Sequence, residues 1–148
     1  TQGVTLFPYT TLFRSIDRAL VSQLLTPTGE LLWVDAEPAL DAVTALSGSG
    51  PAYVFYFIEA MTEAGVEMGL SADQAQRLAI GTFTGASALA HSATEPPSVL
   101  RERVTSKGGT TYAAITSLES ADVKAQFKTA IRAAQKRAAE LGEEFGRG

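Results

Sequence analysis

The 148-residue chain contains no cysteine and only one histidine. Without cysteine it can form neither a disulfide nor a thiolate metal site, although this absence identifies no cellular compartment by itself. Ligand-type side chains do not gather at metal-binding spacing elsewhere in the sequence, so we expect no metal site. The net charge of -4 argues against a basic surface large enough to neutralise a nucleic acid backbone.

Long apolar runs are also missing. No run reaches the roughly 18 residues that a membrane-spanning helix needs, and the N-terminus lacks the charged and apolar regions of a secretory signal. We therefore expect a soluble, cytoplasmic protein. Because 45% of the residues are hydrophobic and 19% are charged, we expect one globular domain with a core and not a disordered chain.

The N-terminal part offers few recognisable elements. Residues 1–15, TQGVTLFPYTTLFRS, show no clear period, and we assign them no fold. Residues 16–24 place apolar side chains on one face, which predicts a short helix ending near Pro27 and Gly29. The apolar run ELLWV at 30–34 predicts a lone strand that needs a partner from elsewhere.

Helical patterns fill the rest of the chain. Asp35 and Pro38 suit a helix start. The stretch SGSGPAY at 47–53 predicts a kink, or a break with Pro51 restarting the helix, because each glycine weakens a helix by about 1 kcal/mol. The following residues, PAYVFYFI at 51–58, are apolar throughout. A helix that is apolar all round is buried on all sides, which in a chain of this size favours an oligomer interface.

The remaining helices have recognisable ends. A capping box at residues 71–74 begins a helix that ends near His91, and a short helix starts at residues 96–97. Asp122 is expected to cap the last helix, and Gly142 is well placed to end it. Six or seven helices and one short N-terminal edge strand predict an all-α fold.

Two glycine motifs could be mistaken for nucleotide loops. In SGSGPAY, Tyr53 occupies the third glycine position of G-x-G-x-x-G, and a helix instead of a strand precedes the motif. In VTSKGGTT at 104–111, Lys107 precedes the glycines instead of following them, which rejects a Walker A motif. We therefore favour a helix kink for the first motif and exclude an ATPase loop for the second.

The stretch VTSKGGTT still permits two interpretations. Gly108 and Gly109 lack a Cβ atom, so a ligand can approach the backbone, and Thr110 and Thr111 begin a helix whose free N–H groups attract an anion. Each such interaction contributes about 0.3–1 kcal/mol when exposed and up to ~2 kcal/mol when partly buried. The size and charge fit a small carboxylate, to which the hydroxyl of Ser106 could also hydrogen-bond. The spacing alone leaves a plain capping turn as the alternative.

The stretch DAVTALSGSGPAYVF at 41–55, paired with VTSKGGTT and followed by an alanine-rich last helix, resembles the C-terminal domain of pyrroline-5-carboxylate reductase over residues 16–145. The resemblance implies NADPH- or NADH-dependent reduction of 1-pyrroline-5-carboxylate in proline biosynthesis. It also implies a homodimer of interleaved helical domains, which in the family often assembles further into a decamer, with the active site at the interface.

The resemblance also assigns roles to the residues of the second motif. Thr111 matches a hydroxyl near the imine nitrogen and is expected to donate a hydrogen bond or relay a proton in the reduction. The residues expected to bind the substrate carboxylate are Ser106, Gly108, Gly109, Thr110 and Thr111.

The chain departs from the family pattern in several positions. Many members have proline at the position of Lys107, which either adds positive charge near the carboxylate or extends into water, and we favour the second. The common Glu-His-Pro is replaced by Glu95-Pro96-Pro97, so no histidine role carries over to position 96. Glu95 is a candidate rim residue of the active site, although a solvated loop carboxylate is the preferred interpretation. For His91 we favour a contact with the helix dipole.

The G-x-G-x-x-G fingerprint of the family's N-terminal Rossmann domain does not occur in this sequence, so the main NAD(P)H site cannot be assigned to it. We interpret residues 1–15 as a foreign leader, 16–35 as a remnant of the inter-domain region, and 36–148 as the helical dimerisation and substrate-binding domain. Such a fragment is expected to have little or no catalysis of its own.

The alternative function is a free-standing helical dimer that binds a small carboxylate, or nothing, without redox chemistry. The helical domain of a β-hydroxyacid or 6-phosphogluconate dehydrogenase is disfavoured, because those families do not carry SGSGPAY paired with SKGGTT.

Overall fold

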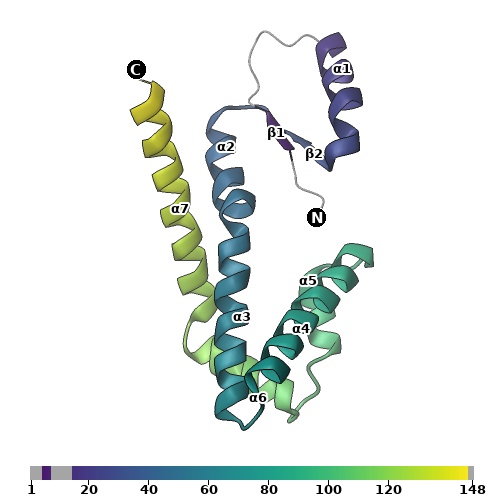
Figure 1. Cartoon of the computed structure of the whole chain (residues 1–148), viewed down its shortest axis with the longest axis vertical. Helices are drawn as coiled ribbons and strands as arrows, with labels where there is room; N and C mark the ends of the chain where they lie inside the picture. The colour runs from purple at the N-terminus through teal and green to yellow at the C-terminus, as the bar shows by residue number, and fades with distance from the viewer. Residues whose placement is uncertain (1–4, 8–14, 147–148) are drawn as a thin grey trace. The chain divides into compact units, whose positions relative to one another are not determined.

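A computed structural model describes residues 5–7 and 15–146 of the chain. The chain divides into two compact units, one made of the described residues up to 50 together with 129–146, and the other made of residues 51–128. The described part contains seven α-helices and two short strands (Figure 1). The expected all-α class is therefore confirmed.

The strand expected in ELLWV is present as β2 (Leu31–Trp33). It follows helix α1 (Ser15–Leu25) and a 3-10 turn η1 (Thr26–Thr28). The strand is not alone, however, because it pairs in parallel with β1 (Thr5–Phe7), where no element was expected. Since parallel neighbours need a long crossover connection, the chain between them, which includes α1, supplies it.

Side-chain contacts attach α1 to β2. The indole Nε1 of Trp33 donates a hydrogen bond of 3.2 Å to the Ser22 hydroxyl. The guanidinium of Arg18 lies 4.8 Å from the centre of the Trp33 ring, which is close enough for a cation–π interaction. Ser22 and Arg18 both belong to α1, so the Trp33 side chain of β2 packs against this helix.

The SGSG segment forms a π-helical turn and does not break the helix. Helix α2 (Pro38–Val43) continues into this turn, η2 (Thr44–Gly48), and then into α3 (Gly50–Glu67). The Ser49 N–H donates to the Thr44 carbonyl at 2.8 Å, a bond that closes a wider turn than that of an α-helix. The backbone of Ser49 also stays in the right-handed helical region, so the expected kink takes the form of a local π turn.

The 51–128 unit contains most of α3 and the beginning of the last helix. Its other elements are α4 (Ala72–Ser92), α5 (Pro97–Arg103), α6 (Thr110–Ser120) and the first residues of α7 (Val123–Gly146). The capping box at the start of α4 is confirmed. The Ser71 hydroxyl accepts from the Gln74 N–H at 3.2 Å, and the Gln74 side chain accepts from the Ser71 N–H at 3.0 Å.

Small residues bring α3 and α4 together. A Cβ atom at Gly65 would lie only 2.8 Å from the Cβ of Ala75, so the two helices approach more closely than any larger residue at 65 would allow. Tyr53 and Phe57 of α3 meet Phe127 of α7 edge to face, with ring centres 5.7 and 5.4 Å apart. These contacts join α3, α4 and the start of α7.

Large apolar side chains of α3 remain uncovered. Phe55 is 61% exposed and Tyr56 is 68% exposed. Within the single chain, residues 51–58 are therefore not buried on all sides, as their composition predicted. The buried residues of this unit are small instead, namely Gly65, Ala75 and Ala79. An apolar surface of this kind marks an interaction site, while interleaving with a second subunit stays a prediction.

The start of α7 differs from the sequence prediction. Asp122 was expected to cap the helix with its side chain, and a capping residue normally has extended backbone. Its φ is +52°, in the left-handed region, and within the described residues its carboxylate accepts no hydrogen bond from α7. The Asp122 carbonyl instead accepts from the N–H of Gln126 at 3.0 Å. The side-chain cap was therefore a wrong prediction.

Gly142 does not end α7, which continues to Gly146. An interior glycine destabilises a helix by about 1 kcal/mol relative to alanine, which a helix of 24 residues tolerates. Arg137 pairs with Glu140 at 3.3 Å and with Glu144 at 2.8 Å, and the second of these ion pairs crosses the glycine. They raise the pKa of Arg137 further and keep it charged.

Candidate functional site

The loop of residues 104–109 connects α5 to α6, and local hydrogen bonds determine its course. The Thr105 hydroxyl donates to the Arg101 carbonyl at 2.6 Å, and the Val104 N–H donates to the same carbonyl at 3.3 Å. The Gly109 N–H donates to the Ser106 carbonyl at 3.0 Å. The chain therefore makes a tight turn directly before the first residue of α6.

The two glycines of this loop are required for different reasons. Gly108 has φ +76°, a left-handed conformation that side chains disfavour. Gly109 has an ordinary extended backbone, with φ -82° and ψ 176°. A Cβ atom there would lie 2.8 Å from the Ser106 hydroxyl oxygen and 3.2 Å from the Ser106 carbonyl oxygen. The turn thus depends on the left-handed backbone at Gly108 and on the missing side chain at Gly109.

The N-terminus of α6 presents hydrogen-bonding groups that the protein leaves unused. Gly109 is the cap residue and cannot offer a side-chain oxygen to the first N–H groups, which have no acceptor inside the helix. In the part of the chain that the structure describes, the hydroxyls of Ser106, Thr110 and Thr111 form no hydrogen bond. Thr111 is half-buried, whereas Ser106 and Thr110 are exposed. Such a combination of donors can bind a small anion.

Glu95 is engaged in an ion pair that spans α5. Its carboxylate contacts the Arg103 guanidinium at 2.6 Å and accepts from the Thr94 hydroxyl at 3.3 Å. The hydrogen bond from Arg103 lowers the pKa of Glu95 below its ordinary value of 4.5. Glu95 is therefore joined to the start of the loop through Arg103.

A second ion pair joins the helices on either side of the loop. Arg101 of α5 contacts Glu119 of α6 at 3.1 Å. Lys107, in the loop itself, forms no ion pair among the described residues. The loop therefore carries a positive charge that no neighbouring carboxylate of the described part neutralises.

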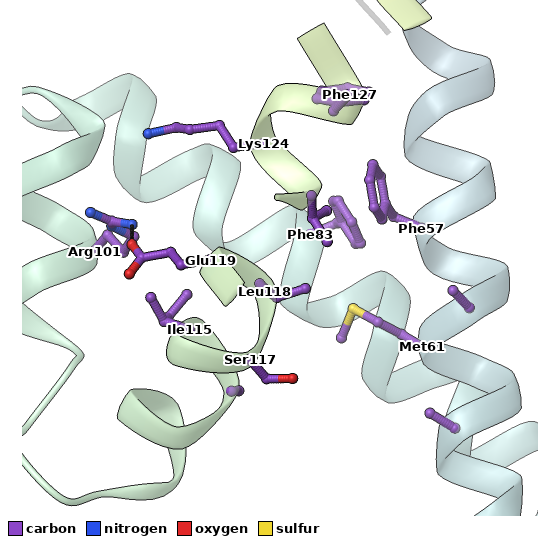
Figure 2. A pocket seen from close by; sticks show the side chains of 14 residues that line it. Phe57, Met61, Phe83, Arg101, Ile115, Ser117, Leu118, Glu119, Lys124 and Phe127 are labelled. Carbon is purple, nitrogen blue, oxygen red and sulfur yellow. Dashed lines mark hydrogen bonds and ion pairs between the residues drawn. The ribbon is translucent and has the colours of Figure 1, made fainter. Parts of the chain in front are cut away.

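An open, mainly apolar pocket of about 910 Å³ lies in the 51–128 unit, lined by α3, α4, α5, α6 and the start of α7. Phe57, Phe83 and Phe127 form an aromatic part of its wall, and the Arg101–Glu119 pair lies at another part of it (Figure 2). Its largely hydrophobic lining suits apolar side chains better than a charged ligand.

The glycine motif at 47–53 does not form a dinucleotide-binding loop in the structure. Tyr53, the third position of the glycine motif, lies inside α3, and the backbone before it is helical. No group of three metal-ligating side chains occurs within residues 5–7 and 15–146. In the same residues, no helix combines the length and apolar character needed to cross a membrane.

The site residues expected from the sequence lie together at one junction, from Ser106 to the first turn of α6, while Glu95 lies before α5. Sequence reasoning missed the ion-paired residues Arg101, Arg103 and Glu119. The run Arg-Glu-Arg directly before the loop was the available signal. The partner of Arg101, however, lies 18 residues further along the chain.

Comparisons with known proteins agree on one family. The family model described as pyrroline-5-carboxylate reductase dimerisation matches residues 37–141. Pyrroline-5-carboxylate reductase of Pseudomonas aeruginosa is 49% identical over 124 residues, which cover 84% of this chain and 45% of that protein. The Arabidopsis thaliana enzyme of the same name is 43% identical over 127 residues, covering 86% of this chain and 46% of the relative.

Solved structures give the same result. A pyrroline-5-carboxylate reductase from Coxiella burnetii has a TM-score of 0.87 and 36% identity, covering 93% of this chain and 51% of that one. Plasmodium falciparum pyrroline carboxylate reductase with NADP bound has a TM-score of 0.83 and 29% identity, covering 94% and 53%. The chain spans about half the length of the relatives it matches. It belongs to the pyrroline-5-carboxylate reductase dimerisation family.

Proposed function

We propose that this chain is the dimerisation and substrate-binding part of a pyrroline-5-carboxylate reductase, which reduces 1-pyrroline-5-carboxylate to L-proline with NAD(P)H. The observation that carries the proposal is the turn at Gly109. It begins α6 without a side-chain cap and so leaves the N–H groups and hydroxyls of its first turn available. Membership of the family supports a substrate carboxylate as the ligand.

In this proposal the substrate carboxylate binds the N–H groups at the start of α6, with Ser106, Gly108, Gly109 and Thr110 around it. The partial positive charge of these N–H groups stabilises a bound anion by up to ~2 kcal/mol when the site is partly buried. Thr111 is the half-buried hydroxyl of this group. It would donate a hydrogen bond to the imine nitrogen or relay a proton to it, which makes the imine carbon a better hydride acceptor.

The hydride donor has no assigned place on this chain. A relative from Plasmodium falciparum was solved with NADP bound, which supports a nicotinamide nucleotide as the donor for the family. The glycine motif of this chain lies in a π turn and in α3, so the nucleotide would have to be held by residues outside this sequence. We therefore propose that residues 1–148 alone bind the substrate carboxylate with little or no catalysis.

A second copy of the chain is the proposed partner. Several apolar side chains of α3 are exposed in the single chain, among them Phe55, Tyr56 and Met61, and a second copy could bury them. The description of the matching family model, which names dimerisation, supports this partner. A homodimer would bury this surface, and dimers could associate further, as into the decamer expected from the resemblance. The proposed active site, Glu95 at its rim included, would then lie near the interface.

The second candidate function is a helical dimer that binds a small carboxylate without redox chemistry. The observation that favours it is the absence of a dinucleotide motif from the sequence given. Both functions share the carboxylate site and differ in whether a nucleotide-binding partner completes it.

The test is calorimetric titration of the purified chain with L-proline, a stable substrate-like ligand, and with NADPH in parallel. Light scattering should give the mass of the species titrated. Binding of proline by a dimer that does not bind NADPH is the expected result. Tight NADPH binding would overturn the proposed absence of the nucleotide site, and a dimer that binds neither ligand would refute the carboxylate site.

Replacing the Thr111 hydroxyl tests its separate role. Thr111→Val keeps the shape of the side chain and removes the hydroxyl, which would accept a hydrogen bond from the protonated ring nitrogen of proline, so it should weaken proline binding about fivefold to tenfold, the effect of one hydrogen bond. Thr111→Ser should restore most of the affinity. Equal affinities of the valine variant and the wild type would argue against any contact between Thr111 and the ligand nitrogen.

A further inference from the structure

The loop of residues 104–109 lies between two helices that an ion pair holds together. Arg101 Nη1 in the last turn of α5 contacts Glu119 Oε1 near the end of α6 at 3.1 Å (Figure 2). Eighteen positions separate the two residues, and the whole loop lies between them in sequence. The ion pair therefore brings together the two ends of the segment 101–119, which contains the proposed carboxylate site.

Arg101 acts on the loop through its backbone as well as through its side chain. Its carbonyl accepts the hydrogen bond of the Thr105 hydroxyl at 2.6 Å, which holds the first residues of the loop against α5. On the other side, the loop continues directly into α6, which carries Glu119. Arg101 thus contacts the first residues of the loop and, through Glu119, the far end of the helix that follows it.

The loop backbone itself restricts the two helices only weakly. It contains consecutive glycines, and glycine has the largest conformational freedom of all residues. The bond from Gly109 to Ser106 shapes the turn locally but does not join α5 to α6. The other charged contact of α5, between Glu95 and Arg103, connects the two ends of α5 and also leaves α6 free.

We propose that Arg101 and Glu119 are positioning residues that fix the orientation of α6 relative to α5, and so set the affinity of the loop for the substrate carboxylate. The inference rests on the proposed function. The first N–H groups of α6 and the Ser106 hydroxyl must point at the same anion. Because they lie on opposite sides of the glycine turn, a small rotation of α6 would separate them.

The expected effect is moderate. The side chains of Arg101 and Glu119 are 41% and 63% exposed, and ion pairs of this kind change equilibria by about 1.4-fold to fivefold. The pair also belongs to the lining of the apolar pocket, so a partner covering that pocket would remove water from the pair. We therefore expect an effect in the upper part of this range when the chain is dimeric.

The test compares the proline affinity of the wild-type 148-residue chain with that of five variants. Arg101→Met and Glu119→Gln each remove one charge and should weaken proline binding about twofold to fivefold, and the double variant should be no weaker than either single one. Arg101→Lys keeps the charge and should restore most of the affinity. Asp73→Asn breaks the exposed Asp73–Arg77 pair on α4, at 3.7 Å, and serves as the matched control with wild-type affinity.

Amide hydrogen exchange supplies a measurement that needs no ligand. Loss of the pair should speed exchange at Thr105, whose N–H donates to the Glu102 carbonyl of α5, and at Gly109, whose N–H donates to the Ser106 carbonyl, more than at the capped start of α4. Unchanged exchange and unchanged proline affinity in Arg101→Met would refute the positioning role while the carboxylate site stands. Failure of the wild type to bind proline would refute the proposed function, and with it the role in affinity. Equal losses in Arg101→Lys and Arg101→Met would show that packing and not charge is responsible, and would also overturn the proposal.

Discussion

Gly109→Ala provides the sharpest test of the carboxylate site. The backbone of Gly109 has φ -82° and ψ 176°, which alanine adopts without strain, so the substitution acts only through its Cβ atom. That atom would lie 2.8 Å from the Ser106 hydroxyl oxygen and 3.2 Å from the Ser106 carbonyl oxygen. The hydroxyl can rotate away. The carbonyl cannot move without lengthening the 3.0 Å hydrogen bond that it accepts from the N–H of residue 109.

The magnitude follows from the cost of overpacking, which is about 1–3 kcal/mol for an added methyl group in a close-packed place. The loop is exposed on one side and can relax, so we expect it to shift rather than the helices to unfold. If the full overpacking energy destabilises the turn conformation that binds proline, the affinity for proline should decrease by about fivefold to 150-fold, at 1.4 kcal/mol per factor of ten. Gly109→Val adds two further methyl groups and should abolish measurable binding.

The assay is calorimetric titration with proline, with circular dichroism and light scattering to show that helix content and mass are unchanged. Gly142→Ala is the matched control, because a Cβ atom there meets nothing within 4 Å and the residue lies inside α7. It should bind proline like the wild type and be more stable by about 0.5–1 kcal/mol. Wild-type affinity in a folded Gly109→Ala variant would refute the role of this turn in ligand binding.

Three further predictions concern the interface, the pH dependence and the helix contact. Phe55→Glu places a charge on the exposed apolar face of α3 and should give a monomer or an aggregate on a sizing column, whereas a monomeric wild type would contradict the interface. Because Arg103 lowers the pKa of Glu95 below 4.5, their pair stabilises the fold above that pH and loses its effect as the pH falls through the lowered pKa. The melting temperature of Glu95→Gln should therefore be lower than that of the wild type at neutral pH, and the two should be equal in acid. A difference in melting temperature that stays constant across this pH range would disprove the linkage. Gly65→Ala would bring its Cβ to 2.8 Å from that of Ala75 and should destabilise the fold by about 1–3 kcal/mol in denaturant unfolding, with no loss being the refuting result.

The elements that sequence reasoning predicted well are those that neighbouring residues determine. The capping box needs only Ser71 and Gln74, three positions apart, and the structure confirms both of its hydrogen bonds. The helices α4 and α6 likewise follow from apolar periodicity and from the residues at their starts. The glycine turn before α6 was recognisable too, because the stretch VTSKGGTT combines two glycines and four hydroxyls in an alanine-rich chain.

The elements that were missed depend on contacts through space. Strand β2 pairs with residues 5–7, which have no periodicity of their own, and only the pairing makes them a strand. Helix α7 passes Gly142, and the contact of Arg137 with Glu144 crosses that position. Asp122 has the composition of a side-chain cap, but its left-handed backbone prevents the geometry of one.

The sequence by itself determined the all-helical class, the family and the stretch in which the candidate site lies, because periodicity, caps and motifs act over a few residues. Only the tertiary structure decided which charges surround that site. Arg101 and Glu119 lie far apart in the chain, and their 3.1 Å contact exists only when α5 and α6 fold back on each other. The tertiary structure also decided that Phe55 and Tyr56 stay exposed, while the close approach of α3 and α4 at Gly65 and Ala75 buries small residues.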